Sequence, residues 1–108
     1  MNIIPTQGIL FYMPIKSFSD KNIEDFFISG NVKKGMGWSS VSKIAKRRLD
    51  ILHYAADLKD LKAIPGNRLE ILKGNLKGTH SIRINDQWRI IFKWSESGAD
   101  DVSIIDYH

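Results

Sequence analysis

HSIRINDQWRIIFKW, residues 80–94, decides the fold because it predicts two antiparallel strands joined by a tight turn. A two-residue turn at residues 85–86 would place Arg83 opposite Trp88 and mix polar with apolar side chains on each face. A three-residue turn, residues 85–87, keeps one apolar side on both strands. We expect this second register, whose pairs are Ile84 with Trp88, Arg83 with Arg89 and Ile82 with Ile90.

This register divides the hairpin into an apolar face and a charged face. The apolar side chains expected to pack under the helices alternate along the second strand: Trp88, Ile90, Phe92 and Trp94. Arg83 and Arg89 would stand opposite each other on the charged face, although directly opposed like charges are unfavourable. An anion such as phosphate would bridge the two guanidinium groups. The alternative is that each arginine pairs with a local carboxylate, such as Asp106 or Glu70.

A short helix is expected over about residues 20–28, before a glycine-rich connection. Ser19 can cap its N-terminus, Asp20 adds negative charge near the dipole, and Gly30 closes it. Its apolar side chains share one face: Ile23, Phe26 and Phe27. Residues 30–38 hold several glycines and two lysines, so we expect a mobile connection there.

A longer helix follows, with Ser39 or Ser40 as its expected cap. Its apolar positions recur at helical steps and form the stripe of an amphipathic helix: Val41, Ala45, Leu49, Leu52 and Ala56. Basic side chains away from this stripe face either water or a nucleic-acid partner. The candidate contacts to RNA or the ribosome are Lys43, Lys46, Arg47, Arg48 and Lys77.

Strand-like alternation follows the helical part of the chain. It predicts four strands, at residues 68–73, 80–84, 88–94 and 102–107. Helix-like material followed by strand-like material indicates an α+β domain with one antiparallel sheet. The length of 108 residues, 43% of them apolar, fits a single domain.

Charge is distributed unevenly along the chain. Residues 1–32 sum to −1, residues 33–93 to +9 and residues 94–108 to −4, within a net charge of +4. The basic middle block would attract a polyanion, most commonly a nucleic acid. The alternative is a solvated basic surface that mainly maintains solubility.

Several function classes are excluded by what the sequence lacks. There is no cysteine, so neither disulfides nor thiolate chemistry are available. The three histidines are not spaced as a metal motif, so we expect no metal or other cofactor. Residues 9–13 are too short an apolar run for an export signal, and nothing approaches a membrane span. We expect a cytoplasmic protein without membrane contact.

Five sequence blocks together resemble the HigB-type toxins of the RelE/ParE superfamily. They are IKSF (15–18), NRLEILKG (67–74), GTHSIR (78–83), NDQWRI (85–90) and the closing DYH (106–108). The blocks occur in the order and spacing of the family. The resemblance indicates one toxin domain over residues 15–108. Residues 1–14 would be an extension that the fold does not require, either a misread start or a disordered tail.

The resemblance implies a fold and an activity. Two N-terminal helices would pack on a twisted, mainly antiparallel sheet of about four strands. The toxin would bind the ribosomal A site and cleave mRNA there without metal, the ribose 2′-hydroxyl attacking the adjacent phosphate. A HigA-type helix-turn-helix antitoxin would neutralise the toxin, and the two together would bind operator DNA and repress their own expression.

The resemblance also assigns roles to residues of this chain. Arg89 and Arg83 would neutralise the charge of the phosphorane, with Lys73 adding a third positive charge. His108 would transfer the proton at neutral pH, and Asp106 would orient it or act as base.

Two further positions close the predicted site. Tyr107 would stack on a base or hydrogen-bond the phosphate. Several ribosome-dependent members have a histidine where this chain has Glu70. That carboxylate would either replace the histidine as general base or pair with Arg89 or Lys73 and weaken catalysis.

Two other hypotheses stay open beside the nuclease. The chain would be a growth inhibitor that works by binding alone, as ParE-type relatives do on gyrase, or a slow nuclease whose main effect is ribosome binding. Gyrase-directed relatives generally lack paired arginines with a terminal histidine. The presence of Arg89, Tyr107 and His108 therefore favours the enzyme.

Overall fold

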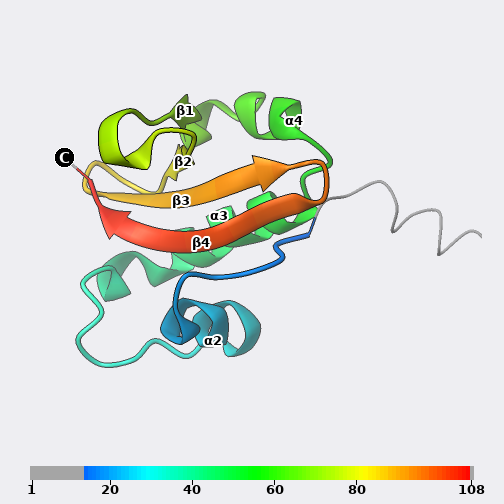
Figure 1. The fold of residues 1–108 in the computed structure, drawn as a ribbon. Helices are drawn as coiled ribbons and strands as arrows, with labels where there is room; N and C mark the ends of the chain where they lie inside the picture. The colour runs from blue at the N-terminus through cyan, green and yellow to red at the C-terminus, as the bar shows by residue number, and fades with distance from the viewer. Residues whose placement is uncertain (1–13, 108) are drawn as a thin grey trace, which may run out of the picture.

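The computed structural model describes residues 14–107 as an α+β domain (Figure 1). The helices and strands, in chain order, are α2 (Lys21–Ser29), α3 (Ser42–Tyr54), α4 (Leu58–Lys62), β1 (Glu70–Ile71), β2 (His80–Arg83), β3 (Trp88–Ser95) and β4 (Gly98–Asp106). Three 3₁₀ turns lie between them: η1 (Ser39–Val41), η2 (Pro65–Asn67) and η3 (Gly74–Leu76). The α+β prediction is confirmed.

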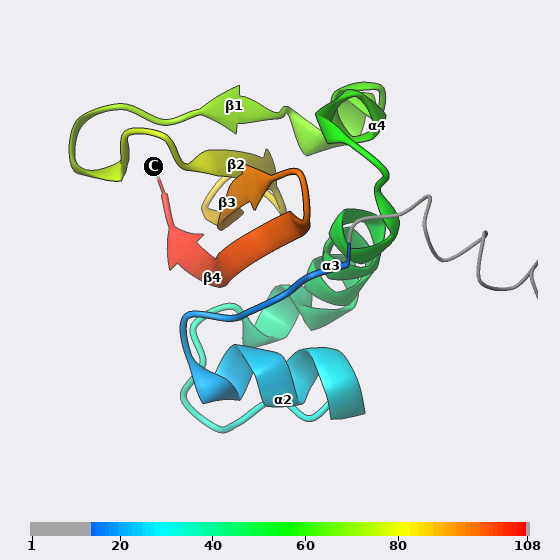
Figure 2. The same cartoon turned by 45° about the vertical axis from the view of Figure 1, so that its right-hand side comes forward.

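The four strands form one antiparallel sheet in the order β1-β2-β3-β4. Helix α3 lies across one face of this sheet, and α2 lies beside α3 on the side of β4 (Figure 2). Helix α4 lies at the opposite edge, beside β1 (Figures 1 and 2). This arrangement leaves the other face of the sheet uncovered by α2 and α3.

The hairpin of β2 and β3 has the register predicted for a three-residue turn. Its backbone pairs include Arg83 with Arg89 and Ile82 with Ile90, and the Ile84 N–H donates to the Trp88 carbonyl at 2.9 Å. The side-chain oxygen of Asn85 closes the turn by accepting the N–H groups of Gln87 at 2.9 Å and Trp88 at 2.7 Å. An asparagine at the start of a turn is suited to this because its short side chain reaches the backbone two residues on.

The core lies between α3 and the apolar face of the sheet. Its fully buried side chains come from both layers: Ala45, Leu49, Leu52, Ile82, Ile90, Phe92 and Val102. Trp88 and Trp94 are half-buried and pack against this core, as predicted. Ala56, expected on the helical stripe, lies outside α3, because the helix ends at Tyr54.

The predicted helix caps need correction. Asp20, not Ser19, is the N-cap of α2, and its carboxylate accepts the Ile23 N–H at 3.0 Å. Gly30 closes that helix with φ +81°, as expected. Neither Ser39 nor Ser40 caps α3, because both lie in η1, which leads into the helix without a side-chain cap.

Helix α4 has no counterpart in the periodic pattern of the sequence. Its five residues are too few to show a period, but a capping box starts it. Asp57 accepts the N–H groups of Lys59 and Asp60, and Asp60 accepts those of Ala56 and Asp57 in return. Leu61 then buries its side chain completely.

Two strands differ in extent from the prediction. β1 holds only Glu70–Ile71, because Arg68 ends η2 in a left-handed conformation and Gly74 starts η3 at φ +68°. β4 begins at Gly98, earlier than expected, because its first residues pair with the end of β3 in a tight hairpin.

The segment before α2 belongs to the domain. Ile15 and Phe18 form parallel bridges to Ala99 and Val102 of β4, and the Ile15 N–H donates to His53 Nδ1 at 3.2 Å. The start of the domain near residue 15 agrees with these contacts but remains a prediction, since residues 1–13 of the proposed extension lie outside the described residues. Within residues 14–107, no helix is long and apolar enough to cross a membrane.

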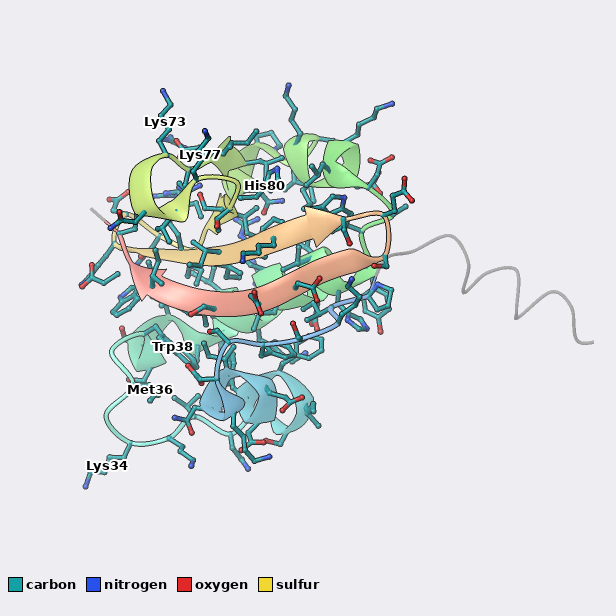
Figure 3. The ribbon with its side chains drawn as sticks, viewed as in Figure 1. Lys34, Met36, Trp38, Lys73, Lys77 and His80 are labelled. Atoms are coloured by element: carbon teal, nitrogen blue, oxygen red, sulfur yellow. The ribbon has the colours of Figure 1, made fainter. Side chains whose placement is uncertain are left out.

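The connection at residues 30–38 is anchored by apolar side chains. Trp38 is buried against Phe26, with ring centroids 4.7 Å apart, and Val32 and Met36 are half-buried against the core. Gly37 lies so close to the Trp88 ring that a Cβ there would stand 2.7 Å from it. Lys34 points away from the domain at the tip of this connection (Figure 3). The mobility expected for this segment stays a prediction.

Leu49→Ala is expected to lower the free energy of unfolding by ~2–5 kcal/mol, because it empties a fully buried position between helix and sheet. Ile28→Ala is the control. Its side chain is 74% exposed, so the change should stay within about 0.5 kcal/mol. Urea unfolding followed by circular dichroism measures both, and equal losses would contradict the placement of the core.

Asp20→Ala is expected to lower the free energy of unfolding by about 1 kcal/mol through loss of the α2 cap. Ser19→Ala, one residue earlier, should have an effect within about 0.5 kcal/mol. The same unfolding measurement distinguishes them. A larger loss of unfolding free energy for Ser19→Ala than for Asp20→Ala would support Ser19 as the cap, as predicted from the sequence.

Candidate active site

Arg89 is a buried cation on the sheet face that points away from α3. Its neighbours in β3, Trp88 and Ile90, point to the core, so strand alternation turns Arg89 to the other side. The side chain is only 8% exposed. Nε donates to Ser81 Oγ at 2.8 Å, while Nη2 donates to the Arg68 carbonyl at 2.6 Å and to the Ser81 carbonyl at 3.3 Å. The guanidinium is therefore held by hydrogen bonds along the edge formed by Nε and Nη2.

Glu70 and Tyr107 stand beside this guanidinium. The pairing of Glu70 with Ser81 across β1 and β2 brings its carboxylate to 3.7 Å from Arg89 Nη2. Tyr107 follows β4 directly, and its ring centroid lies 5.8 Å from Arg89 Cζ. A cation, a carboxylate and an aromatic ring thus converge from β3, β1 and the end of β4.

These groups line a polar hollow of about 270 Å³, which we call the Arg89 hollow. It is lined by Arg68, Glu70, Arg83, Asn85, Asp86, Arg89 and Tyr107. A second hollow of about 470 Å³ shares Glu70 and Tyr107 with it and adds Lys73. The two hollows together offer room and positive charge for more than one phosphate group of an extended polyanion.

The charges that line the Arg89 hollow favour the binding of an anion. Burial lowers the pKa of Arg89, the Glu70 carboxylate acts in the opposite direction, and Arg83 and Arg68 lower it further. Arg83 forms an ion pair with Asp86 in the turn. Three arginines therefore face two carboxylates, and Arg89 is the one shielded from water. An arriving anion would relieve the repulsion among them.

Most residues predicted for the site come together here. Glu70, Arg83, Arg89 and Tyr107 line the Arg89 hollow, and Lys73 lines the second one. Of the local pairings considered for the arginines, the one between Arg89 and Glu70 is present. Arg83 instead pairs with Asp86, because the two lie three residues apart around the turn.

The C-terminal triplet is divided. Asp106 pairs with Trp88 across β3 and β4, so it points away from the face that carries Arg89. Its carboxylate accepts Gln87 Nε2 at 3.0 Å. His108 lies outside the described residues. The roles predicted for these two residues stay predictions.

The basic residues of α3 differ in what they contact. Lys43 and Arg47 are exposed, whereas Lys46 pairs with Asp50 at 2.6 Å. Arg48 donates to the buried Asn67 side chain at 2.9 Å and so ties α3 to η2. Arg48 therefore has a structural contact in addition to any binding role.

Arg48 of α3 and Arg83 of the Arg89 hollow influence each other electrostatically. Burial lowers the pKa of Arg48, and Arg47 and Arg83 lower it further by repulsion. Arg83, which lines the hollow, thus repels the Arg48 guanidinium of α3. Lys73 and Lys77 extend outward from the connection between β1 and β2 (Figure 3). Lys73 also lines the second hollow, next to the Arg89 hollow.

Four residues of the site were not predicted from the sequence: Arg68, Ser81, Asn85 and Asp86. Ser81 lies two residues before Arg83 and therefore on the same, charged face of β2. This spacing of two residues could have indicated Ser81 from the sequence. Arg68 acts through its carbonyl oxygen, which no side-chain pattern reveals. Asn85 and Asp86 belong to the turn between β2 and β3, which borders the hollow.

Neither histidine of the described residues, His53 or His80, lines the Arg89 hollow. His80 faces the core side of β2 and stacks on Phe92 with ring centroids 5.7 Å apart. Burial lowers its pKa. Among residues 14–107, no group of three His, Asp or Glu side chains could hold a metal ion.

The chain matches a known protein family over most of its length. The family model described as RelE-like toxin of type II toxin-antitoxin system HigB matches residues 16–108. The chain is 43% identical over 82 residues to Toxin HigB-1 of Vibrio cholerae, covering 76% of this chain and 85% of that protein. It is 32% identical over 94 residues to Endoribonuclease HigB of Proteus vulgaris, covering 87% and 99%. These matches confirm the resemblance noted in the sequence.

Solved structures share the fold. The chain in the structure of the YoeB dimer from Staphylococcus aureus has a TM-score of 0.52 at 22% identity, covering 90% of this chain and 98% of that chain. The YoeB/ParE toxin from Agrobacterium tumefaciens has a TM-score of 0.50 at 19% identity, covering 89% and 100%. Identities this low establish the fold alone.

Glu70→Gln is expected to raise the affinity of the Arg89 hollow for inorganic phosphate by roughly 3- to 10-fold, because it removes a negative charge beside Arg89. The Glu70 side chain is 53% exposed, so the free energy of unfolding should change by less than about 1 kcal/mol. Phosphate titration followed by NMR and urea unfolding test the two effects. Asp50→Asn on α3 is the charge-matched control, and an affinity equal to that control would contradict the assignment.

Proposed function

The chain belongs to the RelE-like HigB toxins of type II toxin–antitoxin systems, and from this premise we propose that it is an endoribonuclease that cuts mRNA in the ribosomal A site. The observation that carries the proposal is the buried, pre-positioned guanidinium of Arg89 in a hollow that also holds a carboxylate and a tyrosine. The name of the Proteus vulgaris relative, Endoribonuclease HigB, supports it.

Arg89 is proposed to bind the phosphate at the cleavage position. As the 2′-hydroxyl attacks, the phosphorane gains negative charge, and a guanidinium already shielded from water stabilises that charge without reorganising. Arg83 and Lys73 add positive charge from the rims of the two hollows. The products are a 2′,3′-cyclic phosphate and a 5′-hydroxyl.

Proton transfer needs a base for the 2′-hydroxyl and an acid for the 5′-oxygen. We assign Glu70 as the base, because its carboxylate lies in the hollow next to Arg89. His108, the proton-transfer group that the resemblance implies, is then proposed as the acid, with Asp106 as its orienting residue. Tyr107 is proposed to stack on a base or bond the phosphate, since its ring lines both hollows.

Ribosome binding is proposed to use the basic surfaces on either side of the site. The exposed Lys43 and Arg47 of α3 would contact rRNA on one side, with Lys46 and Arg48 as their neighbours, and Lys77 would contact it on the other. Such contacts release counterions, so affinity should fall steeply as salt rises. The toxin would act in the cytoplasm, where ribosomes translate.

A HigA-type helix-turn-helix antitoxin is the proposed partner. It would neutralise the toxin, and the complex would bind operator DNA through the antitoxin and repress its own expression. Membership of a type II toxin–antitoxin family supports the existence of such a partner.

A second candidate function is growth inhibition by binding without cleavage, on the ribosome or, as for ParE-type relatives, on gyrase. The observation that favours it is the ion pair between Glu70 and Arg89, which places a negative charge where substrate phosphate would approach.

Arg89→Ala is expected to lower mRNA cleavage by roughly 100- to 1,000-fold, because it removes the cation that faces the developing charge. Primer extension on a defined mRNA in a purified translation system, with and without ribosomes, measures the cut. Lys21→Ala, whose side chain is 81% exposed on α2, is the charge-matched control and should cleave as the wild type does.

Cleavage at A-site codons that needs both ribosomes and Arg89 would support the nuclease. Growth inhibition in cells without cleavage in any lane would instead favour the binding inhibitor, and Glu70→His would then be the first variant to make. Full cleavage by Arg89→Ala would exclude phosphate chemistry at this arginine.

A further inference from the structure

We propose that Ser81 is a positioning residue for Arg89, and that the backbone carbonyl of Arg68, presented by a left-handed turn, is its second anchor. The inference rests on the proposed function only in taking Arg89 as the phosphate-binding group. Neither Ser81 nor Arg68 touches the reacting atoms in this assignment. Both act by fixing where the guanidinium points.

Three neutral oxygens occupy one edge of the guanidinium. Nε is bonded to Ser81 Oγ, and the two hydrogens of Nη2 are shared between the carbonyls of Arg68 and Ser81. Within residues 14–107, Nη1 makes no hydrogen bond, so it is the group directed to an incoming phosphate. The anchors thus determine which edge of Arg89 is available.

The neutrality of these anchors matters for the chemistry. A carboxylate in hydrogen-bond contact would also hold the guanidinium, but it would cancel the charge that the phosphorane needs. Glu70, at 3.7 Å, is beyond hydrogen-bond distance and half in solvent, so it can move aside. Ser81 is fully buried and cannot exchange its partner for water. Arg89 therefore stays oriented when Glu70 leaves.

The position of Ser81 requires a small side chain that carries a hydroxyl group. It lies in β2 on the same face as Arg83, and its side chain has no exposure. An apolar residue there would leave the buried Nε of Arg89 without a partner, which is unfavourable. The guanidinium would then turn to find another acceptor, and Nη1 would lose its direction.

Arg68 supplies its anchor through backbone geometry. It follows η2 with φ +43°, a conformation that residues other than glycine rarely adopt. Its N–H donates to the Pro65 carbonyl at 3.2 Å, which closes the turn. The left-handed turn directs the Arg68 carbonyl to Arg89 Nη2. The persistence of an unfavourable φ at this point fits a positional requirement.

The test is an NMR measurement of the Arg89 Nε–H, assigned by its absence in Arg89→Ala. We expect a resolved signal that exchanges slowly with water in the wild type, because the group is buried and bonded. Ser81→Ala should lose that protection by at least roughly 10-fold in exchange rate. Ser103→Ala, a serine on the charged face of β4, is the matched control and should leave the signal unchanged.

Function is measured on the same variants. Misplacement of a catalytic group lowers rates by roughly 10- to 100-fold, so Ser81→Ala should lower the single-turnover cleavage rate by that factor on saturating ribosomes. Its affinity for ribosomes should stay within about 2-fold of wild type, since the basic surfaces are intact. A lower cleavage rate with unchanged ribosome affinity would distinguish a positioning role of Ser81 from a general loss of folded protein.

Arg68→Gly tests the backbone anchor. Glycine adopts φ +43° without strain and keeps the carbonyl, so the protected Arg89 signal should persist although the side chain is gone. Loss of the signal in Arg68→Gly would overturn the assignment of the backbone as anchor. An unchanged signal in Ser81→Ala would overturn the role of Ser81. If the wild type shows the protected signal but no cleavage, the positioning holds and the proposed function fails.

Discussion

The register of the β2–β3 hairpin is the constraint on which the rest of the structure depends. A slip of one residue would exchange its two faces, moving Ile82 and Ile90 out of the core and burying Arg89 under α3. The Asn85 side chain closes the three-residue turn and so maintains the register. Core packing and site geometry are therefore both consequences of one short turn.

The same alternation explains how the protein tolerates a buried charge. An unpaired guanidinium inside the core would be strongly destabilising, but Arg89 lies on the face without α2 and α3, and its Nε and Nη2 donate to three oxygens of Ser81 and Arg68. Because these oxygens are uncharged, the positive charge remains available. The opposition of Arg83 and Arg89, unfavourable in an empty site, becomes useful when an anion binds.

The site departs in two ways from the roles that the family implies. Glu70 lies 3.7 Å from Arg89, so the group proposed as base would also compete with the proposed substrate phosphate. Asp106 is turned to the opposite face of β4, next to Gln87. The proposed proton transfer therefore relies on Glu70 more than the closing Asp-Tyr-His sequence suggests.

The sequence by itself determined the hairpin register, the amphipathic α3 and the facing pair Arg83 and Arg89. Such features follow from periods of two and of 3.6 residues, which are local properties of the chain. Only the tertiary structure decided the packing of the short α4, the approach of Glu70 to Arg89 and the anchors of Arg89. That guanidinium is contacted from separate segments of the chain, by Ser81, Arg68 and Glu70. Arg68 contributes a backbone carbonyl, which a pattern of side chains cannot predict. Long-range packing brings them together, so no local pattern predicts the contact.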